Sequence, residues 1–255
     1  MSQPLALQAK AVSAWHGRHQ VLHSVNADFE AGRWTCIVGP NGAGKTSLLK
    51  VLAGLMDSDG EVLLMTKPML SYSPRERARQ LAWLGQHDTA GDDLSVYDVV
   101  MLGRLPHQHW WNGASAQDRQ VVEQCLQERQ LSEWRHRSLG SLSGGERQRV
   151  LLPRALAVQA PVLLMDEPVA NADAPHQSDW LKTVKAATRH GGTVVSVLHD
   201  LNMALRAERL VVMQRGRVVM QAAAHEPALH ECLQEVFEHR LVFHQVQGRW
   251  LALSE

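Results

Sequence analysis

The sequence predicts an α/β fold with a parallel β-sheet, a smaller antiparallel β part near the N-terminus and a helical segment inserted into the middle of the chain. One observation is the apolar run at residues 34–38, which leads through the stretch GPNGAGKT at 39–46 into a helix start. Another is the continuous apolar run at 162–165, which is typical of a central parallel strand. Between about residues 95 and 158, apolar residues instead recur at three- and four-residue spacing, which indicates helices.

The N-terminal part is predicted to be mainly strands, at residues 5–11, 24–29, 34–38, 61–65 and 81–84. A turn is expected at residues 57–60, and Ser73 followed by Pro74 is typical of a helix N-terminus. Trp15 lies in the polar segment 15–19, which we expect to be a turn between the first two strands. Its ring is suited either to a core or hairpin position or to stacking on a nucleobase.

The remaining elements are a run of helices followed by a return to alternating strands and helices. Helices are expected at 95–104, 116–130, 144–158, 176–188 and 227–237, strands at 162–165 and 193–198, and hairpins at 210–220 and 241–253. We therefore expect one compact domain, residues 1–255. Its α/β core would comprise residues 1–85 and 160–255, and its helical subdomain residues 86–159.

The composition is that of an ordinary globular protein, with 45% hydrophobic and 20% charged residues. Lysine plus arginine equals aspartate plus glutamate, so no basic excess favours nucleic acid as a partner. Cys36, Cys125 and Cys232 are isolated, as expected for reduced thiols. The sequence shows no secretory signal and no apolar run approaching 18 residues, so we expect it to work at a membrane only through partners.

The stretch at 39–46 fits the phosphate-binding pattern G-x-x-x-x-G-K-T/S. Glycines let the backbone wrap closely, so that successive N–H groups form an anion-binding nest at a helix N-terminus. Lys45 would reach the β- and γ-phosphates, and the Thr46 hydroxyl would bind Mg²⁺. A glycine-rich turn without a ligand is the alternative. The predicted nucleotide-binding residues of this stretch are Gly39, Pro40, Asn41, Gly42, Ala43, Gly44, Lys45, Thr46 and Ser47.

Two acidic residues end the predicted buried strand at 162–165. Asp166 is placed to hold Mg²⁺, and Glu167 to polarise an attacking water as a general base. Alone, such a pair is often just a helix cap. After a phosphate-binding loop and an apolar strand, it indicates nucleotide hydrolysis.

A second anion-binding stretch is predicted at residues 142–146, where a serine and two glycines open a helix. A plain helix N-cap is the alternative. A single nucleotide would not require two anion-binding stretches that lie far apart in one chain. Two copies related head-to-tail would solve this, with each nucleotide between the Lys45 loop of one copy and the Ser143 helix of the other.

With these motifs in this order, the chain resembles the ATP-binding subunit of an ABC transporter over essentially its whole length. The resemblance implies a P-loop ABC ATPase that uses ATP and Mg²⁺. It places Trp15 as the adenine-stacking aromatic, Gln86 as a glutamine that touches Mg²⁺, and His199 as the switch histidine at the γ-phosphate, a residue that alone would be taken as structural. It further identifies Asp166 with the Walker B aspartate, Glu167 with the catalytic glutamate and Asp173 with the D-loop aspartate. The signature segment LSGGE is Leu142, Ser143, Gly144, Gly145 and Glu146.

Three residues depart from the family pattern. Val169 and Ala172 replace the usual threonine and leucine near Asp173, a change that removes no catalytic group. Pro153 lies inside the predicted signature helix, where it should bend the helix because it removes one backbone hydrogen bond.

The segment from Val99 to His107 resembles V-x-x-G-R-x-P-H of importers for iron-siderophore, haem and cobalamin, and 174–177 echoes a second stretch of that branch. We therefore expect an ATPase subunit on the cytoplasmic face of the inner membrane, with a second copy and integral-membrane permease subunits as partners. A periplasmic or surface substrate-binding protein would be an indirect partner. The alternatives are an exporter ATPase subunit and a soluble ABC ATPase acting on the ribosome or DNA. His107 and His109 are expected to be surface residues rather than metal ligands.

Overall fold

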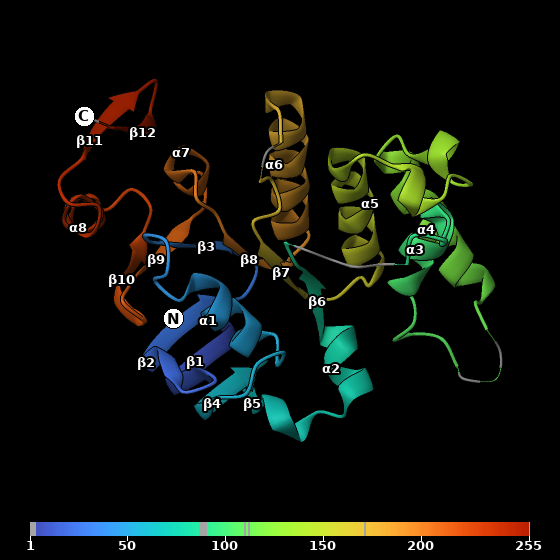
Figure 1. Cartoon of the computed structure of the whole chain (residues 1–255), viewed down its shortest axis with the longest axis horizontal. Coiled ribbons are helices and arrows are strands. Elements are labelled where there is room, and N and C mark those ends of the chain that lie inside the picture. The colour runs from blue at the N-terminus through green and yellow to red at the C-terminus, as the bar shows by residue number, and fades with distance from the viewer. Residues whose placement is uncertain (1–3, 87–90, 110, 112, 171, 255) are drawn as a thin grey trace.

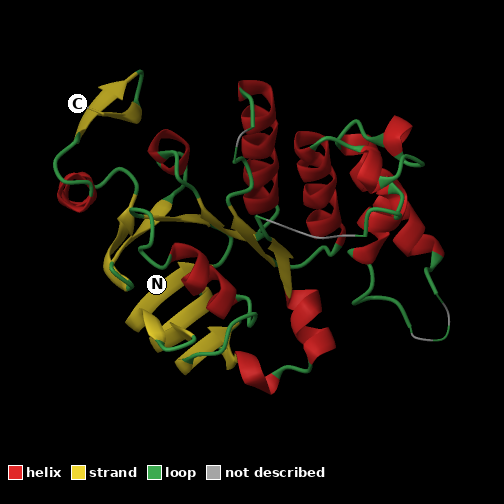
Figure 2. Ribbon diagram, viewed as in Figure 1, coloured by secondary structure: helices red, strands yellow, loops and turns green. Residues whose placement is uncertain are grey.

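A six-stranded sheet forms the centre of the computed structural model, which describes residues 4–254 apart from 87–90, 110, 112 and 171 (Figures 1 and 2). Its strand order is β10-β9-β3-β8-β7-β6. Pairing is parallel from β9 to β6, and β10 is antiparallel to β9. The strands are β3 (Trp34–Val38), β6 (Leu81–Leu84), β7 (Val162–Asp166), β8 (Thr193–Val197), β9 (Arg209–Gln214) and β10 (Arg217–Ala223).

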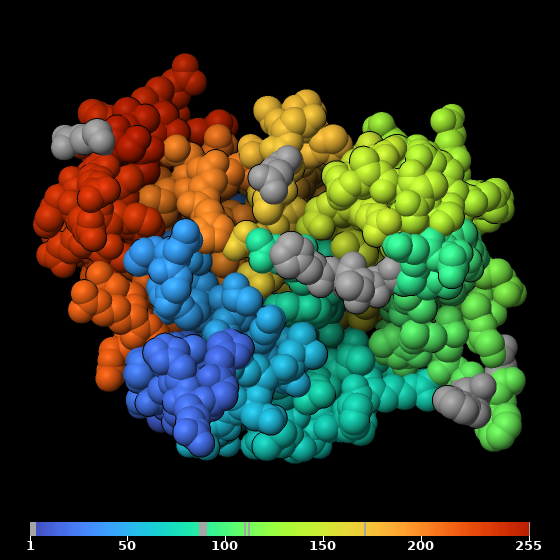
Figure 3. Space-filling view, viewed as in Figure 1, coloured from blue at the N-terminus to red at the C-terminus, as the bar shows by residue number. Residues whose placement is uncertain are grey.

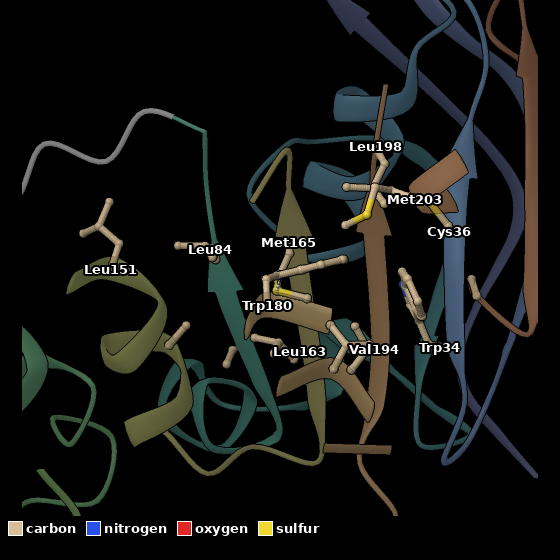
Figure 4. Packing of buried hydrophobic residues seen from close by; sticks show 14 of the residues in the cluster. Trp34, Cys36, Leu84, Leu151, Leu163, Met165, Trp180, Val194, Leu198 and Met203 are labelled. Carbon is tan, nitrogen blue, oxygen red and sulfur yellow. Dashed lines mark hydrogen bonds between the residues drawn. The ribbon is translucent and has the colours of Figure 1, made fainter. Parts of the chain in front are cut away.

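This sheet separates two hydrophobic cores, because alternate residues of each strand point to opposite faces. On one face, Trp34 of β3 packs edge-to-face on Trp180 of α6 (Ala174–Arg189), with 5.4 Å between ring centroids (Figure 4). The indole N–H of Trp34 donates to Ser196 Oγ at 2.9 Å. On the other face, Ile37 packs in the core that contains Leu48 of α1 (Lys45–Leu52). Burial on both faces explains why these strands are continuous apolar runs.

A four-stranded antiparallel sheet, ordered β2-β1-β4-β5, covers the α1 side of the central sheet (Figure 1). Two of the sequence predictions were wrong here. Strand β1 runs through Trp15 and His16, so the turn before β2 is shorter than expected. Strand β4 begins at Asp59, where a turn was expected. The strand can begin this early because residue 60 is a glycine: a Cβ at this position would lie 2.5 Å from the Ala11 carbonyl oxygen of β1. The strands are β1 (Leu5–His16), β2 (His19–Glu30), β4 (Asp59–Leu64) and β5 (Lys67–Pro68).

The inserted helices α3 (Val96–Leu102), α4 (Ala116–Glu128) and α5 (Gly144–Ala157) pack on one another at one end of the molecule (Figure 3). Each begins with a capping box in which a serine hydroxyl accepts from the backbone N–H three residues later. Pro153 is buried within α5, and the helix continues through it. The buried Arg104 joins two of these helices: it pairs with Asp118 of α4 and donates to the carbonyl of Ala157 at the end of α5.

The other elements complete the two faces of the sheet and the C-terminal end. The short pieces η1, η2, η3, β5 and α7 were not predicted, since two to four residues show no periodicity. In the described residues, no helix is long and apolar enough to cross a membrane. These elements are η1 (Met69–Ser71), α2 (Pro74–Gln80), η2 (Ser132–Trp134), η3 (Leu139–Ser141), α7 (Leu201–Ala204), α8 (Pro227–Val236), β11 (Leu241–Val246) and β12 (Arg249–Ser254).

Candidate active site

The stretch at 39–46 forms a tight loop between β3 and α1, as its pattern predicts. Gly39 has φ +149°, and a Cβ at this position would lie 2.1 Å from the Met213 carbonyl oxygen. Gly44 has φ +94°, and a Cβ there would lie 2.9 Å from the Val21 carbonyl oxygen. Both positions therefore require glycine, for backbone conformation and for close approach. Gly39 therefore lies against β9 and Gly44 against β2, and α1 begins directly after Gly44.

Lys45 is buried at the start of α1, 5% exposed, and its ammonium group folds back on the loop. Nζ donates to the carbonyl oxygens of Gly39 at 2.8 Å and Pro40 at 3.0 Å. Burial lowers the pKa of Lys45, and the nearby carboxylates of Glu167 and Asp166 oppose that shift. The lysine thus provides a positive charge at the loop, next to two carboxylates.

The acidic residues lie next to this loop because β3, β8 and β7 are adjacent parallel strands. Val197 of β8 is in register with both Ile37 and Asp166, so the carboxyl ends of the three strands meet at one edge. Thr46 Oγ1 donates to Asp166 Oδ1 at 3.0 Å, although the two residues are 120 positions apart. Burial raises the pKa of Asp166, and the Thr46 hydrogen bond acts in the opposite direction.

Glu167 is held at this edge by partners on both carboxylate oxygens. Gln86 Nε2 donates to Oε2 at 2.7 Å, and His199 Nε2 is hydrogen-bonded to Oε1. Its backbone is in the left-handed region, with φ +48°, and its N–H donates to the Val197 carbonyl oxygen at 3.1 Å. Such a conformation costs energy for a residue with a Cβ and is concentrated at functional sites. The sequence predicted all three side chains for the site, and the structure brings them together.

The oxygen atoms of Thr46 and Asp166 suit Mg²⁺, which prefers one or two protein oxygen ligands together with phosphate and water oxygens. Thr46 Oγ1 and Asp166 Oδ1 are 3.0 Å apart, so a single ion could contact both residues. Among the described residues there is no group of three or more His, Cys, Asp or Glu side chains arranged to hold a metal.

The signature segment lies on another element, at the start of α5. Ser143 Oγ accepts from the Glu146 N–H at 3.4 Å, and Glu146 Oε2 accepts from the Ser143 N–H at 2.8 Å, so the helix N-cap that was the plainer alternative is present. A Cβ on Gly144 or Gly145 would meet no atom within 4 Å. Leu142 is buried in the core. The hydrogen bonds that Ser143 and Glu146 exchange stay within the helix start, and among the described residues none joins this segment to the phosphate-binding loop.

Asp173 is the N-cap of α6, where its Oδ1 accepts from the His176 N–H at 3.0 Å. This hydrogen bond lowers the pKa of Asp173. Asp173, Ser143 and Gly145 line one cavity of about 650 Å³, whose wall includes Trp180. The two segments predicted to face a second copy therefore share one surface.

Trp15 and His16 lie at the end of β1, in the segment that the sequence predicted to be a turn. Trp15 lies on β1 and is 40% exposed, so it is not a core residue. Its neighbour His16 was not singled out, yet its Nε2 lies 3.4 Å from Ser47 Oγ in the first turn of α1. No local pattern predicts this contact. His107 is half-buried rather than on the surface, with Nε2 2.8 Å from the Val158 carbonyl oxygen at the end of α5.

A glycine loop at a helix N-terminus, a buried lysine and two strand-end carboxylates define a nucleotide-binding protein of the P-loop class. Comparisons with known proteins narrow the class. A family model described as ABC transporter matches residues 22–170. The hemin import ATP-binding protein of Myxococcus xanthus is 38% identical over 246 residues, which cover 93% of this chain and 91% of that protein. The ferric enterobactin transport ATP-binding protein of Escherichia coli is 32% identical over 234 residues, which cover 91% and 86%.

Solved structures of ATP-binding cassettes have the same fold as this chain. A nucleotide-free ATP-binding cassette from an ABC transporter superposes with a TM-score of 0.79 at 23% identity, covering 92% of this chain and 98% of that chain. A dimeric post-hydrolysis ATP-binding cassette with ADP and Pi gives 0.77 at 26% identity, covering 86% and 99%. The chain belongs to the ABC transporter family, as an ATP-binding and ATP-hydrolysing subunit.

Proposed function

We propose that this chain powers a membrane importer for iron chelates, either haem or iron-siderophore complexes. The observation that carries this proposal is the similarity over more than nine-tenths of the chain to proteins named for hemin import and ferric enterobactin transport. The segment from Val99 to His107, which resembles the same branch, supports it. We place the protein on the cytoplasmic face of the inner membrane, bound to permease subunits and through them to a substrate-binding protein.

The proposed hydrolysis site uses the residues that the structure brings together. Lys45 would exchange the carbonyls of Gly39 and Pro40 for the β- and γ-phosphates. Thr46, Asp166 and Gln86 would hold Mg²⁺, which when bound neutralises charge on the phosphate oxygens. Glu167 would accept the proton of the attacking water, and His199 would hold the γ-phosphate end in place.

The second half of each site would come from a second copy, arranged head-to-tail. The signature segment would present its N–H groups to the nucleotide of the other copy, and Asp173 would lie beside it. The open space around Gly144 and Gly145 supports this arrangement, since a closely approaching phosphate needs a surface without side chains. A solved cassette of this family that is 26% identical is itself dimeric. The helices α3, α4 and α5, within the proposed subdomain 86–159, would contact the permease.

The variant Glu167→Gln tests the chemistry. It keeps the side-chain shape but removes the general base, so turnover should fall by about 10²- to 10⁴-fold while ATP still binds. The matched control is Glu61→Gln on β4, an exposed residue that pairs with Lys10 and should leave turnover unchanged. Turnover of the Glu167→Gln variant close to that of the wild type would exclude the assigned role of Glu167.

Capture of the same variant with ATP from native membranes tests the partner. The expected result is a co-purified integral-membrane permease together with a substrate-binding protein that binds haem or an iron-siderophore complex. A permease that exports would favour the exporter alternative. Ribosomes or nucleic acid would favour the soluble alternative.

A further inference from the structure

His199 is followed almost at once by α7, a helix of only four residues that begins at Leu201. Asp200 is the N-cap of this helix, and its Oδ1 accepts from the N–H groups of Asn202 at 2.8 Å and Met203 at 3.2 Å. No linker therefore separates His199 from α7. The position of His199 depends on where this helix lies as well as on β8, which ends two residues before it.

Asn202 joins α7 to strand β12, although 50 positions separate the two partners (Figure 1). Its Oδ1 accepts from the Ala252 N–H at 2.8 Å, and its Nδ2 donates to the Ala252 carbonyl oxygen at 3.1 Å. Residues of an antiparallel pair that do not bond to the opposite strand turn both backbone groups outward. The Asn202 amide thus takes both groups of Ala252 at the edge of the β11–β12 hairpin, as a neighbouring strand would.

This C-terminal hairpin has its own attachment to the central sheet, through α8. The His230 ring of α8 stacks on Phe243 with 4.6 Å between centroids, and it meets Trp250 edge-to-face at 4.5 Å. Gln234 Nε2 donates to the Leu241 carbonyl oxygen at 2.9 Å. Helix α8 in turn contacts β9 and β10. A two-stranded hairpin needs such packing on a helix to be stable, so α8 makes the hairpin a fixed partner for α7.

The two hydrogen bonds of Asn202 give α7 a defined orientation. Its neighbours Leu201 and Met203 are buried in the core on the α6 face of the sheet. Apolar burial is non-directional, whereas a hydrogen bond requires a particular geometry. The Asn202 amide therefore fixes the rotation of the short helix, and a rotation would be passed to His199, whose Nε2 is hydrogen-bonded to Glu167.

We propose that Asn202 is a positioning residue for ATP hydrolysis. By docking α7 on the C-terminal hairpin, it holds His199 where the imidazole bonds Glu167 and would meet the γ-phosphate. The proposal rests on the role proposed above for His199, and it extends the residues that determine turnover to the hairpin at 241–254. Misplacing a reacting group by about 1 Å can cost about 10²-fold in rate, so loosening its support should cost about tenfold.

The test measures steady-state ATP hydrolysis by the full chain. Asn202→Ala should lower kcat about tenfold and leave the KM for ATP within about twofold of wild type, because it displaces His199 but not the phosphate-binding loop. The matched control is Gln234→Ala, which removes one hydrogen bond between α8 and the hairpin and leaves both bonds of Asn202 in place. Its kcat should stay within about twofold of wild type.

A double variant distinguishes positioning from general stabilisation. A residue that acts through His199 has nothing to act on once the imidazole is gone, so His199→Ala with Asn202→Ala should turn over within about twofold of His199→Ala alone. A residue that only stabilises the fold would slow both backgrounds by the same factor. If Asn202→Ala does not fold, Asn202→Asp replaces it. The carboxylate keeps an acceptor for the Ala252 N–H but opposes an oxygen to the Ala252 carbonyl, so kcat should fall here too.

The outcomes separate this proposal from the one on which it rests. If His199→Ala hydrolyses ATP like the wild type, the role of His199 is wrong and this proposal falls with it. If His199→Ala is slow while Asn202→Ala keeps the wild-type kcat, only the role of Asn202 is overturned. A double variant about tenfold slower than His199→Ala overturns it as well, since the two losses would then be independent. Thermal unfolding of each variant shows whether the fold is retained.

Discussion

Replacing Arg104 with methionine should lower the free energy of unfolding by about 3–5 kcal/mol, the usual cost of removing one partner from a buried ion pair. Arg104 Nε lies 2.9 Å from Asp118 Oδ1, and their side chains are only 4% and 5% exposed. Nη1 also donates to the Ala157 carbonyl oxygen at 2.7 Å and to Gln159 Oε1 at 3.0 Å. Methionine fills a similar volume but leaves the carboxylate of Asp118 buried without a cation.

Urea unfolding at pH 7, followed by tryptophan fluorescence, measures this loss. The matched control is Lys182→Met, because Lys182 Nζ lies at the same 2.9 Å from Asp179 Oδ1 while those side chains are 75% and 64% exposed. An exposed pair contributes about 0–1 kcal/mol, so the control should unfold almost like the wild type. The reasoning is refuted if Arg104→Met costs less than about 1 kcal/mol or no more than Lys182→Met.

The same pair predicts how stability depends on pH. Burial raises the pKa of Asp118, but hydrogen bonds from Ser115 and Arg104 outweigh it and bring the pKa from 3.8 to about 2. Because the pKa is lower in the folded state, this carboxylate contributes about 2 kcal/mol of stability, which is complete above about pH 5 and lost as the pH falls through about 2. The difference between wild type and Arg104→Met should therefore shrink between pH 5 and pH 3.

Two glycine substitutions test the loop and the surface proposed to meet a second copy. Gly39→Ala places a Cβ 2.1 Å from the Met213 carbonyl oxygen, so ATP binding measured by titration should weaken at least tenfold; unchanged affinity would show that the loop can move away from β9 without cost. Gly145→Ala places its Cβ where no atom lies within 4 Å, so the unfolding temperature should stay the same while ATP turnover falls at least tenfold. Wild-type turnover by Gly145→Ala would contradict the placement of this glycine against the nucleotide of a second copy.

The parts of the fold that sequence predicted are those encoded by local patterns. The strand at 162–165 is a continuous apolar run because both of its faces are buried, and β8 beside it and β3 beside β8 are buried in the same way. The helices α3, α4 and α5 were predicted to within a few residues, since apolar spacing and a serine N-cap mark each of them. The motifs predicted membership of the ABC transporter family, and relatives that align with more than nine-tenths of the chain confirmed it.

The parts that sequence did not predict depend on contacts between distant residues. His107 bonds to Val158 across 51 positions, and His16 lies 3.4 Å from Ser47 across 31 positions. No window of local sequence contains both partners of such a contact. The extent of β1 is similar: Trp15 and His16 pair with Gln20 and His19 of β2, and a polar segment of mixed residues gives no alternation from which to predict this pairing.

The groups assigned to catalysis share one property: each already has a partner within the chain. Lys45 is satisfied by loop carbonyls, Thr46 by Asp166, Glu167 by Gln86 and His199, and Ser143 by Glu146. Lys45 is buried, and a buried charge without a partner costs free energy, so its bonds to the loop carbonyls stabilise the folded chain in the arrangement observed. A bound nucleotide would replace them one by one, and its net affinity would reflect the difference between two sets of bonds. The bond between Gln86 and Glu167 is one of these exchanges: the Gln86 amide occupies one acceptor position on Oε2, and each carboxylate oxygen keeps a lone pair with which to accept a proton.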